Sequence, residues 1–487
     1  MGTDFLQLDR ASAPAGGLSD WLTTQLRSAI ADGRLPVGST LPASRVLAGE
    51  LSVSRGVVAE AYQRLAEEGH VAGRGRAGTR VVAAPIGVPS VPLSLAAPER
   101  QTLGGAPGAA VFEALRAIPC RIDLSPGVPD LAAFPRSAWL RAERTVLSDL
   151  APAGFGYGDP RGATAFRVAV ANWLARNRGI RAAPHEVIVT AGVAQSLALL
   201  ARVLRQAGVS EVAVEDPGSL GARQQLQSWG LGTPPVGVDD RGLRVGELRA
   251  SGAAAVMITP AHQFPTGVVL DGARRRELRQ WAIDGGLVIE DDYDAEHRYD
   301  RPPVPALRAA LPDRVCYAGS VSKLLAPALR VGWLLVPPAL HDAVVAAKRD
   351  TDLGNAVLPQ LVLAELMASG ELERHHRLLR KRHVRRRDAM MQAVGAHLPR
   401  ARVHGAAAGL HLTLTFGERV SDVAGQQPDA DLAAAALERG VKTQPLSWHR
   451  QRPGPPGLVL GYAASTPAQI DDGVAVIAGV LRSWRVS

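Results

Sequence analysis

Near the start of the chain, apolar residues recur at the spacing of a helix. Over residues 18–33 they fall on one helical face, and Gly33 supplies a stop signal. The members of this face are Leu18, Trp21, Leu22, Leu26, Ala29 and Ile30. Two shorter helical patterns and a glycine-containing hairpin pattern follow, at residues 43–51, 54–69 and 70–82. With Ser54 as the N-cap of the third helix, this order indicates a winged helix-turn-helix in residues 1–83.

The pattern changes after this segment. Residues 84–119 are rich in proline, glycine and alanine and show no sustained periodicity, so we expect a linker, with a loop packed on a domain surface as the alternative. In residues 120–487, short apolar runs alternate with helical patterns such as 195–208 and 272–286. The runs lie at residues 187–190, 212–215, 256–259, 287–291, 315–320 and 333–337. This alternation predicts an α/β domain with a mostly parallel sheet, and the C-terminal end reads as a smaller α+β part.

Composition narrows the classes of protein only slightly. A hydrophobic content of 46% is typical of a soluble globular protein, and neither a membrane-spanning run nor a secretory signal is visible. The two cysteines, Cys120 and Cys316, lie far apart, which fits a reducing cytoplasm. The net charge of +9 admits nucleic acid or acidic ligands as partners. A GC-rich genome, which raises the arginine content of its proteins, is a serious rival explanation of this charge.

Charge is distributed locally at the N-terminal end. Residues 1–83 carry nine arginines against eight acidic residues, whereas the hairpin carries Arg74, Arg76 and Arg80 without an acid. The N-terminal part of the third helix would enter a major groove of DNA, with the hairpin beside it. A small packing module with a solvated charged face is the alternative that composition leaves open.

The sequence of this region resembles a known DNA-binding domain. The segment PVGSTLPASRVLAGELSVSRGVVAEAYQRLAEEGHVAGRGRAGTRVV is similar to the winged helix of the GntR superfamily, including its L-P-x-x-R-x-L-A start and the S-R after the turn. The resemblance implies contacts to double-stranded promoter DNA by Arg45, Ser54, Arg55, Arg74, Gly75 and Arg76. One departure is Gly56, which stands where a threonine is common.

Lys323 is conspicuous because only four of the 55 basic residues are lysines. It follows an apolar run and two serines, Ser320 and Ser322, and a Schiff base needs an amine that can lose its proton, which arginine cannot supply. Arg330 can pair with a phosphate. Upstream, the IEDDYD segment at 289–294 places carboxylates at the end of a strand, where ligands gather in open α/β sheets, although such a cluster can also bind a metal.

Further segments extend this pattern along the chain. They are YGDPRG (157–162), VTAGVAQSL (189–197), EDPG (215–218), TPAHQFPTG (259–267), IEDDYDAEHRY (289–299) and GSVSKLLAPALRVGW (319–333). In this order they resemble fold-type I pyridoxal-phosphate (PLP) aminotransferases, and specifically the MocR/GabR-type regulators that fuse this fold to a GntR-type winged helix. The resemblance implies PLP as the cofactor and Lys323 as the aldimine lysine, with Asp291 paired to the pyridine nitrogen and Tyr293 to the ring oxygen. It implies a phosphate site made of Arg330, Ser320, Ser322 and the backbone around Val193 and Ala194, and a homodimer in which Tyr157 reaches the partner's phosphate site.

Three positions depart from the aminotransferase pattern. Phe264 replaces an asparagine that contacts the ring oxygen, and Ser219 replaces an aromatic residue that stacks on the ring. Val459 stands where a carboxylate-binding arginine is expected, with Arg450 or Arg452 as candidate substitutes. These departures count against ordinary transamination.

The leading hypothesis is therefore a dimeric DNA-binding regulator that binds PLP and senses PLP itself, an amine or an amino acid. A working aminotransferase is the first alternative, and a regulator whose large domain has lost PLP and only supports dimerisation is the second. The basic run at residues 374–387 also resembles these regulators. We expect it to be solvated or packed between domains, with DNA passing beside it as the alternative.

Overall fold

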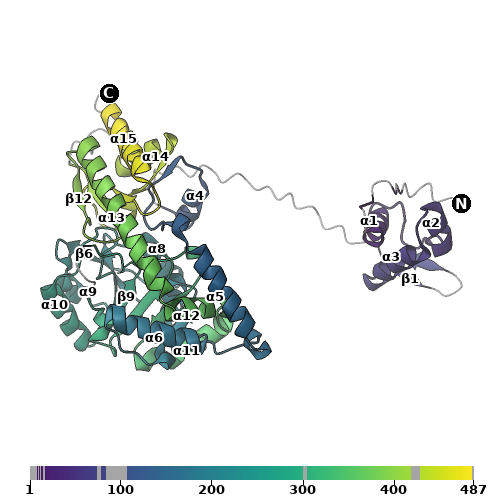
Figure 1. Ribbon diagram of the computed structural model, residues 1–487, viewed down its shortest axis with the longest axis horizontal. Helices are drawn as coiled ribbons and strands as arrows, with labels where there is room; N and C mark the ends of the chain where they lie inside the picture. The colour runs from purple at the N-terminus through teal and green to yellow at the C-terminus, as the bar shows by residue number, and fades with distance from the viewer. Residues whose placement is uncertain are drawn as a thin grey trace. The chain divides into compact units, whose positions relative to one another are not determined.

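The chain forms two compact units, Met1–Arg100 and Gln101–Ser487 (Figure 1). The computed structural model describes residues 8, 10, 13–14, 17–73, 78–83, 107–294, 296–299, 304–417 and 428–484. Within these ranges no helix is long and apolar enough to cross a membrane.

The first unit has the predicted winged helix-turn-helix. Its elements are α1 (Leu18–Ala31), α2 (Ser44–Glu50), α3 (Arg55–Glu67), β1 (Val71–Gly73) and β2 (Thr79–Val81). The apolar face expected for the first helix is largely buried, with Leu22 and Leu26 packed among the inward residues of α2, α3 and the antiparallel β1–β2 pair. Ser54 caps α3 as predicted, because its hydroxyl accepts a hydrogen bond from the amide of Val57 at 3.4 Å.

The second unit is built on an eight-stranded sheet in the order β4-β11-β10-β9-β8-β5-β6-β7. Its strands are β4 (Ile188–Thr190), β5 (Ala213–Asp216), β6 (Pro235–Asp239), β7 (Gly242–Leu243), β8 (Ala255–Ile258), β9 (Leu287–Asp292), β10 (Val315–Ser320) and β11 (Gly332–Leu335). The pairs from β10 through β9, β8 and β5 to β6 are parallel, and β11 is antiparallel to both of its neighbours. The prediction of a mostly parallel α/β sheet is confirmed.

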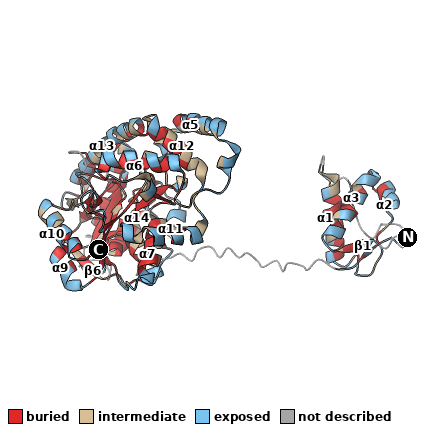
Figure 2. Ribbon diagram, turned by 90° about the horizontal axis from the view of Figure 1, so that it is seen from below, coloured by how far each residue is buried: buried red, intermediate tan, exposed pale blue. Residues whose placement is uncertain are grey.

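Helices cover both faces of this sheet. They are α5 (Arg136–Asp149), α6 (Thr164–Arg178), α7 (Val193–Gln206), α8 (Leu220–Ser228), α9 (Val245–Ser251), α10 (Gly272–Ile283), α11 (Pro338–Asp352) and α12 (Val357–Ala368). Alternate residues of β10 serve opposite cores: Tyr317 packs with α5, α6 and α12, whereas Cys316 packs with α7 and α11. Figure 2 shows the buried residues concentrated between the sheet and the inward faces of the helices.

The C-terminal part is the smaller α+β layer. Its elements are β12 (Arg402–His404), β13 (His411–Thr415), β14 (Val441–Lys442), β15 (Gln444–Pro445), β16 (Gly457–Gly461), α13 (Glu371–His397), α14 (Pro428–Glu438) and α15 (Pro467–Trp484). Strands β12, β13, β16 and β15 form an antiparallel sheet in that order, and β14 pairs with β3 (Ile122–Asp123). Apolar residues of α13, α14 and α15 bury one common core against this sheet.

One segment of the expected linker is ordered. Residues 111–117 form α4 (Val111–Ala117), whose Val111 and Leu115 are buried with Trp448 of the C-terminal part. Phe112 makes an edge-on contact with the same indole at 6.4 Å between ring centroids. The end of the 84–119 range therefore packs on the second unit, which is the alternative that its composition had left open.

The basic run lies on α13 and is partly internal. Arg382 and Arg386 form ion pairs with the buried carboxylate of Asp130 at 2.7 and 2.8 Å, and His375 and His383 are buried. This part of the run therefore packs inside the second unit, which differs from the expected solvated or interdomain position.

Candidate functional site

Three of the residues predicted to contact DNA lie at or near the starts of α2 and α3 in the first unit. Arg45 stands in the first turn of α2, and Ser54 and Arg55 stand at the start of α3. All three are exposed, and in the described part of the chain neither arginine has a hydrogen-bond or ion-pair partner. The N-terminus of α3 also has first-turn amides without helical acceptors, which suits it to phosphate oxygens.

Other arginines of the same unit form internal ion pairs. Arg27 of α1 donates to Glu68, and Arg64 of α3 donates to Asp20 and Glu60. These pairs tie α1 to the end of α3. The unit thus separates paired arginines from the unpartnered Arg45 and Arg55.

The tip of the hairpin is outside the described residues. Arg74, Gly75 and Arg76 fall there, so their DNA contacts remain predictions. Arg80 lies on β2 within the described range, and its guanidinium donates to the carbonyl of Gly38. That arginine therefore braces the loop before α2.

Lys323 lies in the loop after β10, at the carboxyl edge of the sheet. Its ammonium donates to the carbonyl of Gly127, and burial lowers the pKa of Lys323 from its ordinary value. A Cβ atom at Gly127, whose φ is +77°, would lie 3.1 Å from Nζ. The amine is thus held in a narrow, desolvated place, and burial brings it closer to the neutral form that Schiff-base chemistry needs.

Asp291 lies on the neighbouring parallel strand, β9, in register with Ala318 of β10. Burial and then the charges of Asp292 and Asp294 raise its pKa to about 8, while the charge of Lys323 lowers it. Its Oδ1 is buried and has no hydrogen-bond partner among the described residues. An unpartnered buried carboxyl oxygen is costly, so this atom is suited to a ligand that brings a ring nitrogen.

An anion cradle forms where the β4–α7 turn meets the segment after β10. Gly192 has φ +88°, and a Cβ there would fill the space beside Arg330, 3.6 Å from its guanidinium, and Ser322, 4.0 Å from its hydroxyl. Val193 and Ala194 open α7, so their amides have no acceptor in the preceding turn of the helix. Helix N-terminus, guanidinium and hydroxyl together suit a phosphate.

Ser320 ends β10, and its hydroxyl accepts a hydrogen bond from the amide of Ser322 at 3.4 Å. The structure therefore brings Lys323, Ser320, Ser322 and Arg330 together on one connection. Residues present on this edge fit PLP: an amine, a carboxyl for the ring nitrogen and a phosphate cradle.

Tyr293 follows β9 and points to a histidine. Its hydroxyl lies 2.9 Å from Nδ1 of His262, which lies 2.8 Å from Oδ2 of Asp294. Burial, followed by the charges of Asp294 and Asp291, holds the pKa of Tyr293 well above its ordinary value. Phe264 packs edge-on against Tyr293, at 6.0 Å between ring centroids.

The positions that depart from the aminotransferase pattern have structural roles. Ser219 caps α8 by accepting from the amide of Ala222 at 3.3 Å. Val459 is fully buried in β16, opposite Thr413 and Gln444.

Arg450 and Arg452 are the candidates to replace the carboxylate-binding arginine that is absent at Val459, but both are engaged in other contacts. Arg450 donates to the carbonyl of Pro455, and Arg452 donates to Glu247 at 3.0 Å and to the carbonyl of Pro235 at 2.8 Å. The expected role of these two arginines therefore has no support in their contacts.

Tyr157 lies on the surface of the second unit, with a side chain that is 94% exposed. Other large apolar residues between positions 131 and 168 are also exposed, namely Leu131, Leu140, Leu147, Phe155 and Val168. Exposed apolar residues that gather into one patch typically mark contact with another protein.

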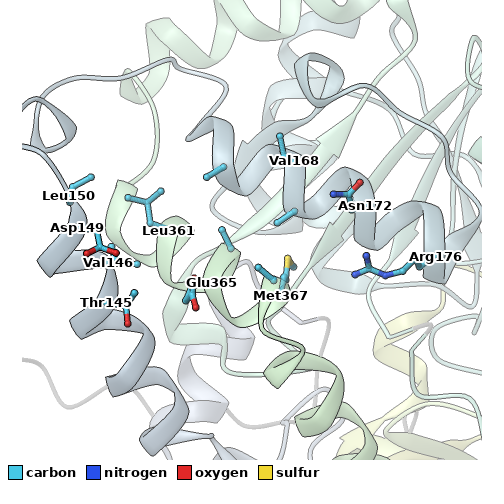
Figure 3. A pocket seen from close by; sticks show the side chains of 14 residues that line it. Thr145, Val146, Asp149, Leu150, Val168, Asn172, Arg176, Leu361, Glu365 and Met367 are labelled. Atoms are coloured by element: carbon cyan, nitrogen blue, oxygen red, sulfur yellow. The ribbon is translucent and has the colours of Figure 1, made fainter.

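A groove of about 430 Å³ opens between α5, α6 and α12. Val146 lines it from α5, Leu150 from the position directly after α5, Val168 from α6, and Leu361 and Met367 from α12 (Figure 3). None of the cofactor-site residues lines it.

Sequence reasoning missed several residues near the cofactor edge. His262 and Asp294 lie within the PLP motifs, but the sequence alone indicated no role for them. Glu215 is fully buried, and burial raises its pKa to about 7. Its carboxylate accepts from the amide of Thr259 at 3.1 Å and from its hydroxyl at 2.8 Å. The available sequence signal was the position of these residues near strand ends, to which the PLP motifs by themselves assign no role.

Comparison with known proteins agrees with this architecture. The family "Bacterial regulatory proteins, gntR family" matches residues 18–81, and "Aminotransferase class I and II" matches residues 121–477. The chain is 31% identical to the "Probable rhizopine catabolism regulatory protein MocR" of Rhizobium meliloti, over 93% of this chain and 91% of that protein. It is 32% identical to the "HTH-type pyridoxine biosynthesis transcriptional regulator PdxR" of Corynebacterium glutamicum, over 91% of each chain.

Solved aminotransferase structures share the fold of the second unit. An archaeal alanine:glyoxylate aminotransferase superposes with a TM-score of 0.69 at 25% identity, covering 77% of this chain and 93% of that chain. LysN, the α-aminoadipate aminotransferase of Thermus thermophilus, was solved in complex with N-(5'-phosphopyridoxyl)-L-leucine. It superposes with a TM-score of 0.67 at 25% identity, covering 79% of this chain and 96% of that chain.

The two units define a DNA-binding transcription regulator in which a winged helix-turn-helix is joined to a fold-type I aminotransferase domain. The chain belongs to the MocR-type regulators of the GntR family.

Proposed function

We propose that this regulator binds PLP at Lys323 and changes its hold on promoter DNA when PLP, an amine or an amino acid occupies the site. The observation that carries the proposal is the buried, unpartnered Oδ1 of Asp291 on the strand beside Lys323. No internal hydrogen bond from the described residues satisfies this oxygen, and the anion cradle at Gly192 lies along the same edge of the sheet.

The residues of the chain divide the work of binding. Arg330, Ser322 and the amides that open α7 take the phosphate, and this fixes the ring in the site. Because the pKa of Asp291 is raised to about 8, the carboxyl holds a proton near neutral pH that it can give to a ring nitrogen, leaving an ion pair. Burial makes the amine of Lys323 easier to deprotonate. When bound, PLP supplies an aldehyde and an electron-withdrawing ring.

Regulation rather than ordinary transamination is the function that the site supports. Val459 is buried in a sheet, and Arg450 and Arg452 are engaged elsewhere, so the described residues at this end offer no evident cation for a substrate carboxylate. The exposed, unpartnered arginines of the winged helix are available to bind DNA. A ligand shifts the regulator only if it interacts differently with two states of the protein.

Spectroscopy combined with DNA binding tests the proposal. The purified protein with PLP should show a visible absorption band that shifts when a reactive amine is added. The same additions should change its affinity for its own upstream DNA, measured by fluorescence anisotropy. A wild-type protein without a band would exclude PLP at Lys323, and rapid turnover of amino acids would favour the aminotransferase alternative.

We further propose a homodimer in which Tyr157 completes the partner's phosphate site. Its support is the exposure of Tyr157 and of the large apolar side chains of Leu147 and Phe155. Light scattering of the full chain should show a dimer, and Leu147→Glu should weaken it and reduce PLP occupancy. Ile283→Glu, an exposed apolar position on α10, is the control that should change neither. A monomer with full PLP occupancy would refute the shared site.

A further inference from the structure

His262 sits in a three-membered group with Tyr293 and Asp294. A single ring nitrogen, Nδ1, is 2.9 Å from the phenol oxygen and 2.8 Å from the carboxylate oxygen. The other ring nitrogen, Nε2, is buried and has no hydrogen-bond partner among the described residues. The two nitrogens of this imidazole are therefore in very different surroundings.

These surroundings determine where the proton of a neutral His262 lies. On Nε2 it would be a buried donor without an acceptor, which costs about 1–3 kcal/mol. The lone pair of Nδ1 would then face the carboxylate oxygen of Asp294 at 2.8 Å. On Nδ1 the proton is donated to Asp294 and only a lone pair is left unsatisfied. Asp294 therefore selects the Nδ1–H form of the ring.

Backbone packs closely against the ring of His262. A Cβ atom at Gly409 would lie 1.9 Å from Cε1 of His262, and one at Gly267 would lie 3.0 Å from Nε2. Both glycines have positive φ, +82° and +71°, so the imidazole is enclosed by backbone that approaches closely from two sides. The position of Nδ1 beside Tyr293 is thus built into the fold.

We propose that His262 and Asp294 are positioning residues for Tyr293, which hold its phenol oxygen where it can hydrogen-bond the ring oxygen of the cofactor. Because Nδ1 bears a proton, the phenol oxygen accepts from it, and the phenolic hydrogen is directed to Asp294. The ring oxygen of a bound cofactor would compete with Asp294 for this hydrogen. This inference rests on the proposed binding of PLP beside Lys323.

Other titratable groups surround the three residues. They are Asp291 on β9, Glu215 on β5, His411 on β13 and Lys323 after β10. His411 bonds the carbonyl of Pro265 through Nε2 at 3.1 Å, so it supports the neighbouring turn and does not contact Tyr293 through that atom. Substitutions of His262, Tyr293 or Asp294 must therefore be compared with a control variant that removes a carboxylate outside these three residues.

A metal ion is the competing interpretation of this cluster. His262, Asp294 and His411 offer ligand atoms that all lie within 4.8 Å of one another. A metal bound through the unpartnered Nε2 of His262 would leave the hydrogen bonds at Nδ1 in place, whereas a metal at Nδ1 would displace them. The contacts at Nδ1 are accounted for without a metal, so hydrogen bonding is the interpretation we adopt, and treatment with a chelator tests the alternative.

The pH dependence of the visible band of the PLP-loaded protein tests the proposal. An O–H donor to the ring oxygen lowers the proton affinity of the bound chromophore, so losing this donor raises the pH midpoint of the band. Tyr293→Phe should raise it by about 1 pH unit, which is the order of one hydrogen bond to a charged group. His262→Leu should raise it similarly, whereas His262→Asn should largely retain the wild-type midpoint, because the amide keeps an N–H donor near the position of Nδ1.

Non-additivity separates positioning from a general effect on the fold. The double variant Tyr293→Phe/His262→Leu should have the midpoint of Tyr293→Phe alone, because the histidine acts through the phenol. Asp216→Asn is the control, since this buried carboxylate accepts from the amides of Gln451 and Arg452 and does not contact Tyr293. It should leave the midpoint unchanged.

Distinct outcomes identify what has failed. A wild-type protein without a band contradicts the proposed function, whereas a normal band with an unshifted His262→Leu midpoint, or fully additive shifts, overturns the positioning role alone. Dialysis against a chelator should not move the wild-type midpoint. A shift that Zn²⁺ reverses would assign the cluster to a metal and overturn the proposal.

Discussion

The two units of this regulator place their functional charges in opposite environments. In the winged helix, Arg45 and Arg55 are exposed and have no partner among the described residues, while Arg27 and Arg64 are paired. In the aminotransferase-like unit, the carboxyl of Asp291 is enclosed, and its pKa is raised to about 8. The arginines of the winged helix are therefore hydrated in the absence of DNA. The buried carboxyl of the aminotransferase-like unit is partly neutralised in the absence of a ligand.

This difference decides how each unit recognises its ligand. Solvated arginines meet a polyanion through long-range attraction and release of counterions, which salt weakens. Enclosed groups act over short distances, where burial strengthens each interaction and makes protonation part of binding. The DNA unit should therefore be sensitive to ionic strength, and the cofactor unit should be sensitive to pH.

The largest expected effect is at Lys323. Lys323→Ala should abolish the visible band and the response to effectors, because no other amine is proposed to react with PLP. DNA binding should persist, since the winged helix has its own core. Absorption spectra and anisotropy measure both, and Lys381→Ala, an exposed lysine on α13, should behave as wild type. A variant that keeps the band and the response would show that Lys323 is not the cofactor lysine.

Asp291→Asn should have opposite effects on binding and stability. PLP affinity should fall by roughly 10- to 100-fold, because a hydrogen bond to a charged group is lost. The folded-state pKa of Asp291 is raised to about 8, so wild-type stability declines as pH rises from the unfolded pKa toward 8. The cofactor-free variant should then be more stable than wild type at pH 8 by on the order of 2–3 kcal/mol, with little difference near pH 4. Denaturant unfolding at both pH values checks this, and a constant difference would argue against the raised pKa.

Arg55→Ala should weaken promoter binding by about tenfold, the scale of one lost groove or phosphate contact. The slope of log affinity against log salt should decrease by about 0.9 if the contact is to a phosphate. PLP content should not change. Arg76→Ala in the hairpin tip should weaken binding in the same way. Unaltered affinity in both variants at physiological salt would exclude this surface as the DNA interface.

The smallest effect is expected at a paired arginine of the same unit. Arg27→Ala removes the pair with Glu68, in which both side chains are about a third exposed, so the free energy of unfolding should fall by less than about 1 kcal/mol. Promoter affinity should equal that of wild type. A loss comparable with that of Arg55→Ala would show that the paired and unpaired arginines do not differ in function.

Local patterns predicted the fold because each element carries its own signal. The apolar stripe of 18–33, the cap at Ser54 and the short β runs from 187 to 337 correspond to elements of the structure. The helix at Val111–Ala117 could not be predicted in the same way. It is short and flanked by glycine and proline, and its stability comes from packing on Trp448, far along the chain.

The sequence by itself determined which chemical groups the candidate site offers: an amine at Lys323, a carboxyl at Asp291 and a guanidinium at Arg330. Only the tertiary structure decided which of them is buried and which is satisfied. It left Oδ1 of Asp291 without a partner among the described residues, placed His262 between Tyr293 and Asp294, and engaged Arg450 and Arg452 elsewhere. The physical reason is that desolvation and hydrogen bonding depend on atoms contributed by strands and turns that are distant along the chain, and no local sequence pattern specifies those neighbours.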